Sequence, residues 1–137
     1  MARSRFLEEA TIMRDAACSC GSLRLACRGE PVKVSLCHCR ACQRRTGSSF
    51  GIAAFYARDA VRVSGSERRY TRASDRGSPV TFHFCVTCGS TLYFEPRRMP
   101  TLIAVAVGAF ADPTFPPPGQ EVYCEERHTW LPSPLLP

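Results

Sequence analysis

The 137-residue sequence has no apolar segment long enough to span a bilayer, which takes about 20 residues. Its longest apolar run is Leu102 to Phe110. The N-terminal stretch from Met1 to Asp15 mixes charged and isolated apolar residues and lacks the continuous apolar core of a signal peptide. We therefore expect a soluble, cytoplasmic protein with no membrane partner, forming one domain over residues 1–137 with its core at about 15–131.

Lysine is almost absent, since Lys33 is the only one beside 17 arginines and 12 acidic residues, which gives a formal charge of +6. The arginines are scattered along the chain and form no basic tail. Such modest basicity suits an anionic small molecule as well as a polynucleotide. Binding of two zinc ions by thiolates would lower the net charge of the protein from +6 to about +3.

Helix signals are also scarce, because only Arg40–Thr46 is expected to be helical and it is at most two turns long. Short alternating segments punctuated by Gly, Pro, Asp and Ser predict an all-β domain of small antiparallel sheets. The expected strands are 22–27, 31–36, 50–56, 61–63, 67–72, 79–84, 91–94 and 101–107.

Cysteine, by contrast, is abundant, with nine in the chain. A disulfide framework needs an oxidising compartment, and it would leave one thiol over. Two pairs, Cys18 with Cys20 and Cys37 with Cys39, are separated by a single residue, so neither pair could bridge internally without strain. Clustered thiols in a reducing compartment predict metal binding instead.

Four of the thiols form two pairs, each followed by a glycine: Cys18-x-Cys20-Gly21 and Cys85-x-x-Cys88-Gly89. A tight turn ending in glycine lets two sulfurs face one ion while backbone N–H groups point at the thiolates. The two pairs together would complete the tetrahedral shell of one zinc ion and leave no open position. We expect Cys18, Cys20, Cys85 and Cys88 to form a closed, structural site.

Three further thiols lie within six residues, at Cys37, Cys39 and Cys42. Cys37 and Cys39 share one side of an extended chain, so His38 between them is expected to point away. Three thiolates leave a fourth zinc position for water or substrate, which is typical of catalytic zinc. In the alternative, a distant residue closes the site; the candidates are Cys27, Cys124, His83 and His128.

An open, thiolate-ligated zinc favours a soft donor such as a substrate thiol, whose pKa it would lower. Arg40, Arg44 and Arg45 follow the cluster directly and could pair with substrate carboxylates. The plainer interpretation of these arginines is a solvated helix face.

These motifs, in this order, resemble the family of glutathione-dependent formaldehyde-activating enzymes, whose domain is shared with centromere protein V. The resemblance runs from about Cys18 to Trp130 and rests on four pieces: Cys18-x-Cys20-Gly21; Cys37-His38-Cys39-x-x-Cys42-x-Arg44-x-Thr46-Gly47; Phe82-x-Phe84-Cys85-x-x-Cys88-Gly89-Ser90; and the closing Trp130.

The resemblance implies an Mss-four-like fold with several small β-sheets. It also implies a structural zinc on Cys18, Cys20, Cys85 and Cys88 and a catalytic zinc on Cys37, Cys39 and Cys42. The implied activity is that of a carbon–sulfur lyase, which condenses glutathione with formaldehyde to S-hydroxymethylglutathione. The three arginines with Thr46, Gly47 and Ser48 would be the candidates for holding the tripeptide.

A different class of function is a non-catalytic zinc module that binds a protein or a nucleic acid. Such a module should carry long basic extensions, or aromatic residues interleaved with arginines on one surface. The sequence outside the resemblance is short at both ends and shows neither feature. We therefore expect an enzyme with a small thiol and an aldehyde as partners, and no nucleic acid.

Overall fold

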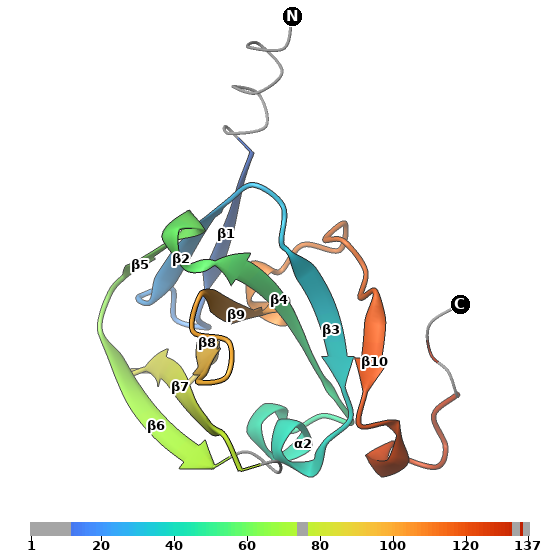
Figure 1. The fold of residues 1–137 in the computed structure, drawn as a ribbon. Coiled ribbons are helices and arrows are strands. Elements are labelled where there is room, and N and C mark those ends of the chain that lie inside the picture. The colour runs from blue at the N-terminus through green and yellow to red at the C-terminus, as the bar shows by residue number, and fades with distance from the viewer. Residues whose placement is uncertain (1–11, 74–76, 133–134, 136–137) are drawn as a thin grey trace, which may run out of the picture.

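The computed structural model of the protein describes residues 12–73, 77–132 and 135. Strands dominate it, and all eight predicted strands and the predicted helix are present (Figure 1). The elements are β1 Met13–Ala17, β2 Arg24–Arg28, β3 Lys33–Cys37, α2 Arg40–Thr46, β4 Gly51–Ala57, β5 Val61–Ser64, β6 Glu67–Ala73, β7 Pro79–Cys85, β8 Thr91–Pro96, β9 Leu102–Ala106 and β10 Gln120–Val122, with short 3₁₀ turns η1 Arg58–Ala60, η2 Val107–Phe110 and η3 Cys124–Glu126.

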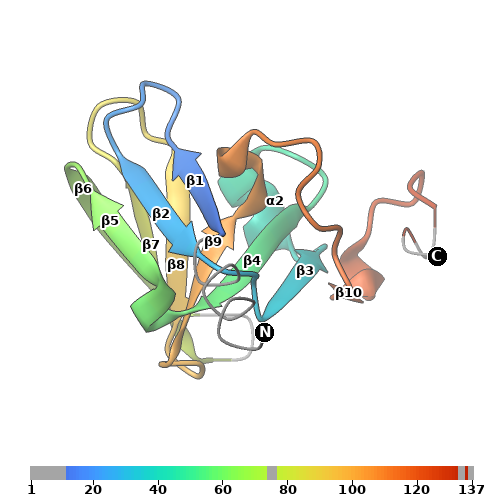
Figure 2. The same cartoon turned by 90° about the horizontal axis from the view of Figure 1, so that it is seen from above.

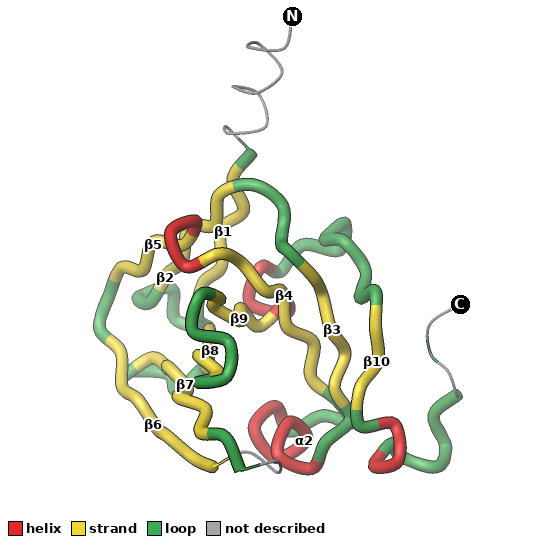
Figure 3. The backbone as a smooth tube through the Cα atoms, viewed as in Figure 1, coloured by secondary structure: helices red, strands yellow, loops and turns green. Residues whose placement is uncertain are grey.

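The larger of two sheets has seven strands in the order β10-β3-β4-β9-β8-β7-β6. All neighbours in it are antiparallel except β10, which runs parallel to β3. Figures 1 and 3 show the sheet curling round so that α2 lies between its two edges, with β6 and β7 on one side and β3 and β10 on the other. This curvature gives the sheet a concave face that holds the end of α2.

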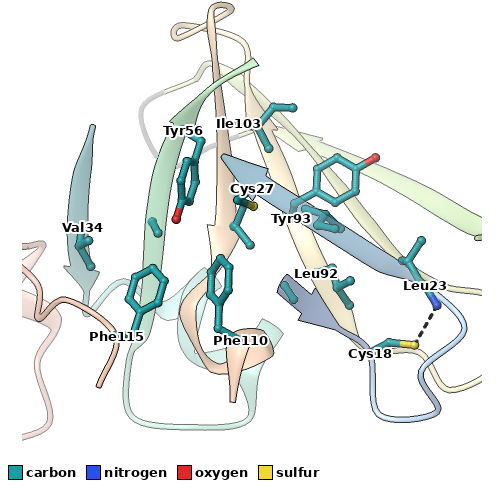
Figure 4. Close-up of a cluster of buried hydrophobic side chains, with 14 of the residues drawn as sticks. Cys18, Leu23, Cys27, Val34, Tyr56, Leu92, Tyr93, Ile103, Phe110 and Phe115 are labelled. Carbon is teal, nitrogen blue, oxygen red and sulfur yellow. Dashed lines mark hydrogen bonds between the residues drawn. The ribbon is translucent and has the colours of Figure 1, made fainter. Parts of the chain in front are cut away.

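The smaller sheet, in the order β1-β2-β5, packs against the other face of the larger one (Figure 2). Its apolar residues Ala16 and Leu25, with Leu23 just before β2, join a core with residues from β4, β8 and β9. Figure 4 shows this core, in which Tyr56, Leu92, Tyr93, Ile103 and Phe110 are labelled. The burial of these side chains contributes about 1.5–3 kcal/mol each and holds the two sheets together.

Strand alternation separates this core from the concave face. Val34 in β3 and Ala54 and Tyr56 in β4 belong to the core between the sheets. Their neighbours in β4, Ala53 and Phe55, point the other way into a second apolar cluster with Ala104. Since successive side chains in a strand face opposite sides, Cys37 shares the concave face with these residues.

The predicted all-β class is confirmed, with one helix and short 3₁₀ turns. The structure differs in two details from the expected set of several small antiparallel sheets. One sheet has seven strands, and it contains a parallel pair. The strands β1 and β10 were not among the expected ones. Within the described part of the chain, no helix is both long and apolar enough to cross a membrane.

Cys27 is fully buried between the sheets, which predicts a difference in reactivity among the thiols. Burial, together with the nearby Asp15, raises the pKa of Cys27 to about 12. Only about one thiol in ten thousand would then be ionised at pH 8, and the thiolate is the form that alkylating reagents attack. We expect iodoacetamide to label the exposed Cys124 in the native protein and to leave Cys27 unmodified, as read by peptide mass spectrometry.

Denatured protein serves as the control, since both thiols should then react. Labelling of native Cys27 as fast as Cys124 would contradict this assignment to the core.

Candidate functional site

The four cysteines of the two Gly-terminated pairs lie together at one end of the molecule. The ligand atoms of Cys18, Cys20, Cys85 and Cys88 all lie within 4.8 Å of one another. Both turns are built alike: the N–H of the first cysteine donates to the residue after the turn, and Gly21 and Gly89 take the left-handed conformation, with φ of 81° and 79°. A residue with a side chain would be strained at those two positions.

The sulfur separations in this cluster fit a metal ion better than disulfides. The Sγ atoms of Cys18 and Cys20 are 3.6 Å apart, and those of Cys20 and Cys85 are 3.7 Å apart. A disulfide needs about 2.05 Å, whereas sulfurs bound to tetrahedral zinc at about 2.3 Å lie about 3.8 Å from one another. The cluster is therefore compatible with a four-thiolate zinc site.

Serines and backbone amides surround these four sulfurs. The Ser22 hydroxyl lies 3.1 Å from Cys20 Sγ and 3.2 Å from Cys85 Sγ, and Ser90 Oγ lies 3.3 Å from Cys88 Sγ. The N–H of Leu23 donates to Cys18 Sγ at 3.2 Å, as drawn in Figure 4. Donors of this kind stabilise thiolates and orient metal ligands, and they lower the pKa of Cys85 to about 7, with Ser22 as the main cause.

The second cluster sits where β3 ends and α2 begins. The ligand atoms of Cys37, Cys39 and Cys42 lie within 4.8 Å of one another. Cys39 is the N-cap of α2, and its sulfur accepts the Cys42 N–H at 3.3 Å. Hydrogen bonds from Cys37 and Cys39, with the charge of Arg45, lower the pKa of the Cys42 thiol. The helix start therefore gathers three sulfurs and favours negative charge on Cys42, whereas the neighbouring thiols, Cys39 first, raise the pKa of Cys37.

Among the described residues, no fourth protein ligand joins this cluster. Cys27 is in the core, and His83 is stacked on Tyr93 with its nitrogens on two carboxylates. His128 donates to Gln43, and Cys124 groups with His38 and Glu121 instead. The alternative in which one of these residues closes the site thus finds no support in the geometry.

His38 turns away from the three sulfurs, as expected from strand alternation, and anchors the loop that carries them. Its side chain is fully buried, and Nε2 lies 2.8 Å from a carboxylate oxygen of Glu121 in β10. Its backbone N–H donates to Val122, and its carbonyl accepts from Gln43 Nε2 at 2.8 Å. The parallel pairing of β10 with β3 therefore fixes the position of Cys37 and Cys39.

A cavity of about 620 Å³ opens on the concave face of the large sheet, and all three sulfur-bearing residues of the second cluster line it. Its walls include apolar side chains, Phe55, Val80, Phe94 and Met99 among them. The cavity is large enough for a molecule of several hundred daltons. A metal ion on the three thiolates would present its remaining coordination position beside this space.

Comparison with known proteins agrees with this arrangement. The family model described as glutathione-dependent formaldehyde-activating enzyme matches residues 13–126, which include both cysteine clusters. The chain belongs to this family. A relative from Halomonas elongata, provisionally named a glutathione-dependent formaldehyde-activating enzyme, is 25% identical over 127 residues, covering 88% of this chain and 80% of its own.

The fold is shared with a crystal structure of a Rhodobacter sphaeroides protein. That likeness has a TM-score of 0.55 at 24% identity and covers 69% of this chain and 85% of the other. The Mss-four-like, all-β fold expected from the sequence is confirmed. The family resemblance deduced from the four motif pieces is confirmed as well.

The three arginines expected to hold substrate do not all lie at the cavity. Arg45 lines the cavity, with its guanidinium 5.1 Å from the centre of the Phe94 ring and 5.8 Å from that of Phe82. Arg40 is exposed and lies 4.0 Å from Glu126, and Arg44 is exposed on the helix surface. Of the three arginines, only Arg45 borders the cavity.

Thr46, Gly47 and Ser48 terminate α2 and do not line the cavity. Thr46 Oγ1 donates to the Cys42 carbonyl at 2.8 Å and accepts the Ser48 N–H at 3.1 Å. Gly47 is the left-handed C-cap, with φ of 66°. These residues fix the length of the helix that carries Cys42 and Arg45.

Three cavity-lining cations went unnoticed in the sequence: Lys33, Arg72 and Arg98. They come from β3, from β6 and from the turn after β8, far apart in the chain. No local motif links them, so only the curvature of the sheet reveals that they share one space.

Proposed function

We propose that this protein is a zinc-dependent carbon–sulfur lyase that joins a thiol to an aldehyde, with glutathione and formaldehyde giving S-hydroxymethylglutathione. Family membership supports this proposal, and one structural observation carries it: three cysteines, which no fourth ligand joins within the described part of the chain, line a cavity of about 620 Å³. A closed four-thiolate cluster lies apart from that cavity. We assign two zinc ions per chain, a structural one to Cys18, Cys20, Cys85 and Cys88, and a catalytic one to Cys37, Cys39 and Cys42.

A zinc ion on three thiolates supplies a Lewis acid with an open position for a soft donor, and it lowers the pKa of a thiol held there. In the overall reaction a carbon–sulfur bond forms between the thiol sulfur and the aldehyde carbon. The π pair of the carbonyl moves to its oxygen, which takes up the proton released by the thiol. Atoms and charge balance without a further reactant.

The chain's own residues bind and position the substrate. Arg45 lies beside Cys42 and contributes positive charge where anionic sulfur collects. Phe55, Phe94 and Met99 add apolar surface to the cavity wall, against which the apolar part of a substrate can pack. Gly51 leaves room for the arginine, because a Cβ there would lie 2.9 Å from Arg45 Nη2. Of the three helix arginines, we propose only Arg45 as a substrate contact, because it is the one that lines the cavity.

The activity can be measured by NMR as exchange between formaldehyde, free thiol and the hydroxymethyl thioether. We expect the zinc-loaded protein to raise the rate with glutathione at least about tenfold above the spontaneous rate. Chelator-treated protein and the Cys124→Ser variant are the controls, the first inactive and the second fully active. No rate enhancement with any thiol and aldehyde tried would contradict the enzyme and favour the non-catalytic binding module.

A further inference from the structure

Of the residues that the structure describes, four cations line the cavity, Lys33, Arg45, Arg72 and Arg98, and one acidic residue, Glu125. Arg45 reaches in from the helix that carries Cys42. The other three come from strands β3 and β6 and from the turn after β8. Their position relative to the sulfurs follows from the register of the sheet.

Lys33 and Cys37 lie at opposite ends of β3, on the same side of the strand. Four residues of strand separate them by about 13 Å. From Lys33 a row of paired residues crosses the sheet at one level, through Phe55, Ala104 and Phe94 to Phe82. Lys33, Phe55 and Phe94 of this row line the cavity, four strand residues away from the level of Cys37.

Arg72 and Arg98 lie still farther from the thiols. Arg72 pairs with Val80, two residues past Phe82 on the side away from Cys37, which adds about 7 Å. Val80 also pairs with Pro96, the last residue of β8, and Arg98 follows in the next turn. The three cations therefore gather at the end of the cavity opposite the three sulfurs.

Aromatic rings support two of these three cations. Lys33 Nζ lies 4.7 Å from the centre of the Phe55 ring, and the Arg72 guanidinium lies 5.1 Å from that of Phe82. Arg45 lies over the same Phe82 ring, so two guanidinium groups share one aromatic support. Across the described ranges none of the four enters an ion pair, whereas Arg14 and Arg58 each pair with a glutamate.

Like charges brought together in a partly apolar cavity repel one another, and an anion bound among them relieves that repulsion. The rings under Lys33 and Arg72 limit the rotamers of these side chains, so less conformational freedom is lost when an anion binds. A cavity prepared in this way is complementary to a ligand with negative charge at one end and sulfur at the other.

We infer that Lys33, Arg72 and Arg98 form an anion subsite that selects long thiols carrying negative charge remote from the sulfur. That the ligand carries a sulfur rests on the proposed function. That it carries negative charge at its other end rests on the residues of the cavity alone. Carboxylates of a peptide thiol and the phosphate of a phosphorylated thiol share the required chemistry. Short neutral thiols lack it.

The test measures binding of S-methylglutathione to the zinc-loaded full chain by calorimetry. Its sulfur is blocked, so the result does not depend on turnover. We expect Lys33→Met, Arg72→Met and Arg98→Met each to weaken binding at least about fivefold, since each removes a charge-assisted contact. Arg62→Met, on the exposed side of β5 in the other sheet, is the matched control and should bind as the parent does.

Two further probes separate the ligand classes. The diester of S-methylglutathione lacks both carboxylates and should not bind measurably. S-methyl-phosphopantetheine carries a terminal phosphate instead. If either anionic probe binds more tightly than the diester, and its affinity falls in the three variants, the result supports the subsite. The probe that binds more tightly then identifies the anion. Equal affinity for the diester, or unchanged affinity in all three variants, would overturn the inference, while loss of turnover with anion binding intact would refute only the proposed function.

Discussion

Cys88→Ser is expected to unfold or aggregate the protein, or to lower its melting temperature by about 15 °C or more. Cys88 is exposed and packs little, so the substitution removes a sulfur ligand and hardly disturbs the core. The four-thiolate cluster joins the turn before β2 to the turn after β7, across 64 residues between Cys20 and Cys85. Structural zinc contributes about 10–16 kcal/mol in small domains, comparable with the entire stability of a domain this size.

The matched control is Cys124→Ser, another exposed thiol that lies outside both sulfur clusters. Circular dichroism melting of the two variants beside the parent checks the expectation. We expect the control to melt within about 2 °C of the parent, as surface substitutions usually do. If Cys88→Ser melted with the control, the assignment of a structural ion to this cluster would be wrong.

Cys39→Ser is expected to lose one of two zinc ions and at least about 99% of the activity while keeping the fold. Cys39 caps the helix and is one of the proposed zinc ligands, and serine is itself a strong N-cap residue, so the start of α2 should survive the change. Hydroxyl is a far poorer zinc ligand than thiolate at neutral pH. Because the cluster lies at the cavity wall and does not join the two sheets, its loss should cost little stability.

Zinc content by mass spectrometry, melting temperature and NMR turnover together decide this case. The pairing with Cys88→Ser is informative because the substitution is the same and only the cluster differs. Similar melting of both variants would show that the division into a structural and a catalytic ion is incorrect. Retained turnover by Cys39→Ser at one zinc per chain would remove the catalytic role of this cluster.

The parts of the fold that could be predicted are those with local signals. The limits of α2 were correct because Cys39 can cap it and Gly47 can end it in the left-handed conformation. β7 alternates between less buried and buried side chains from Pro79 to Phe82, and the alternation changes phase at the register shift between His83 and Phe84. The grouping of seven cysteines into four and three followed from their spacing, and the structure brings the same residues together.

What escaped prediction depends on contacts between distant segments. β1 consists mainly of small and charged residues and is ordered by pairing with β2, and β10 is three residues long and pairs with β3 across more than 80 positions. Lys33, Arg72 and Arg98 meet only because the sheet curls. Arg40 and Arg44 follow the cysteines in sequence, yet the rotation of the helix directs them to the surface.

The most direct measurement is a crystal structure of the zinc-loaded protein soaked with a thiol, with anomalous scattering recorded at the zinc edge. We predict two zinc peaks per chain, one enclosed by four cysteine sulfurs and the other held by Cys37, Cys39 and Cys42 with the sulfur of the soaked molecule as its fourth ligand. A second ion bound by four side chains of the protein, or no ion at those three cysteines, would contradict the account.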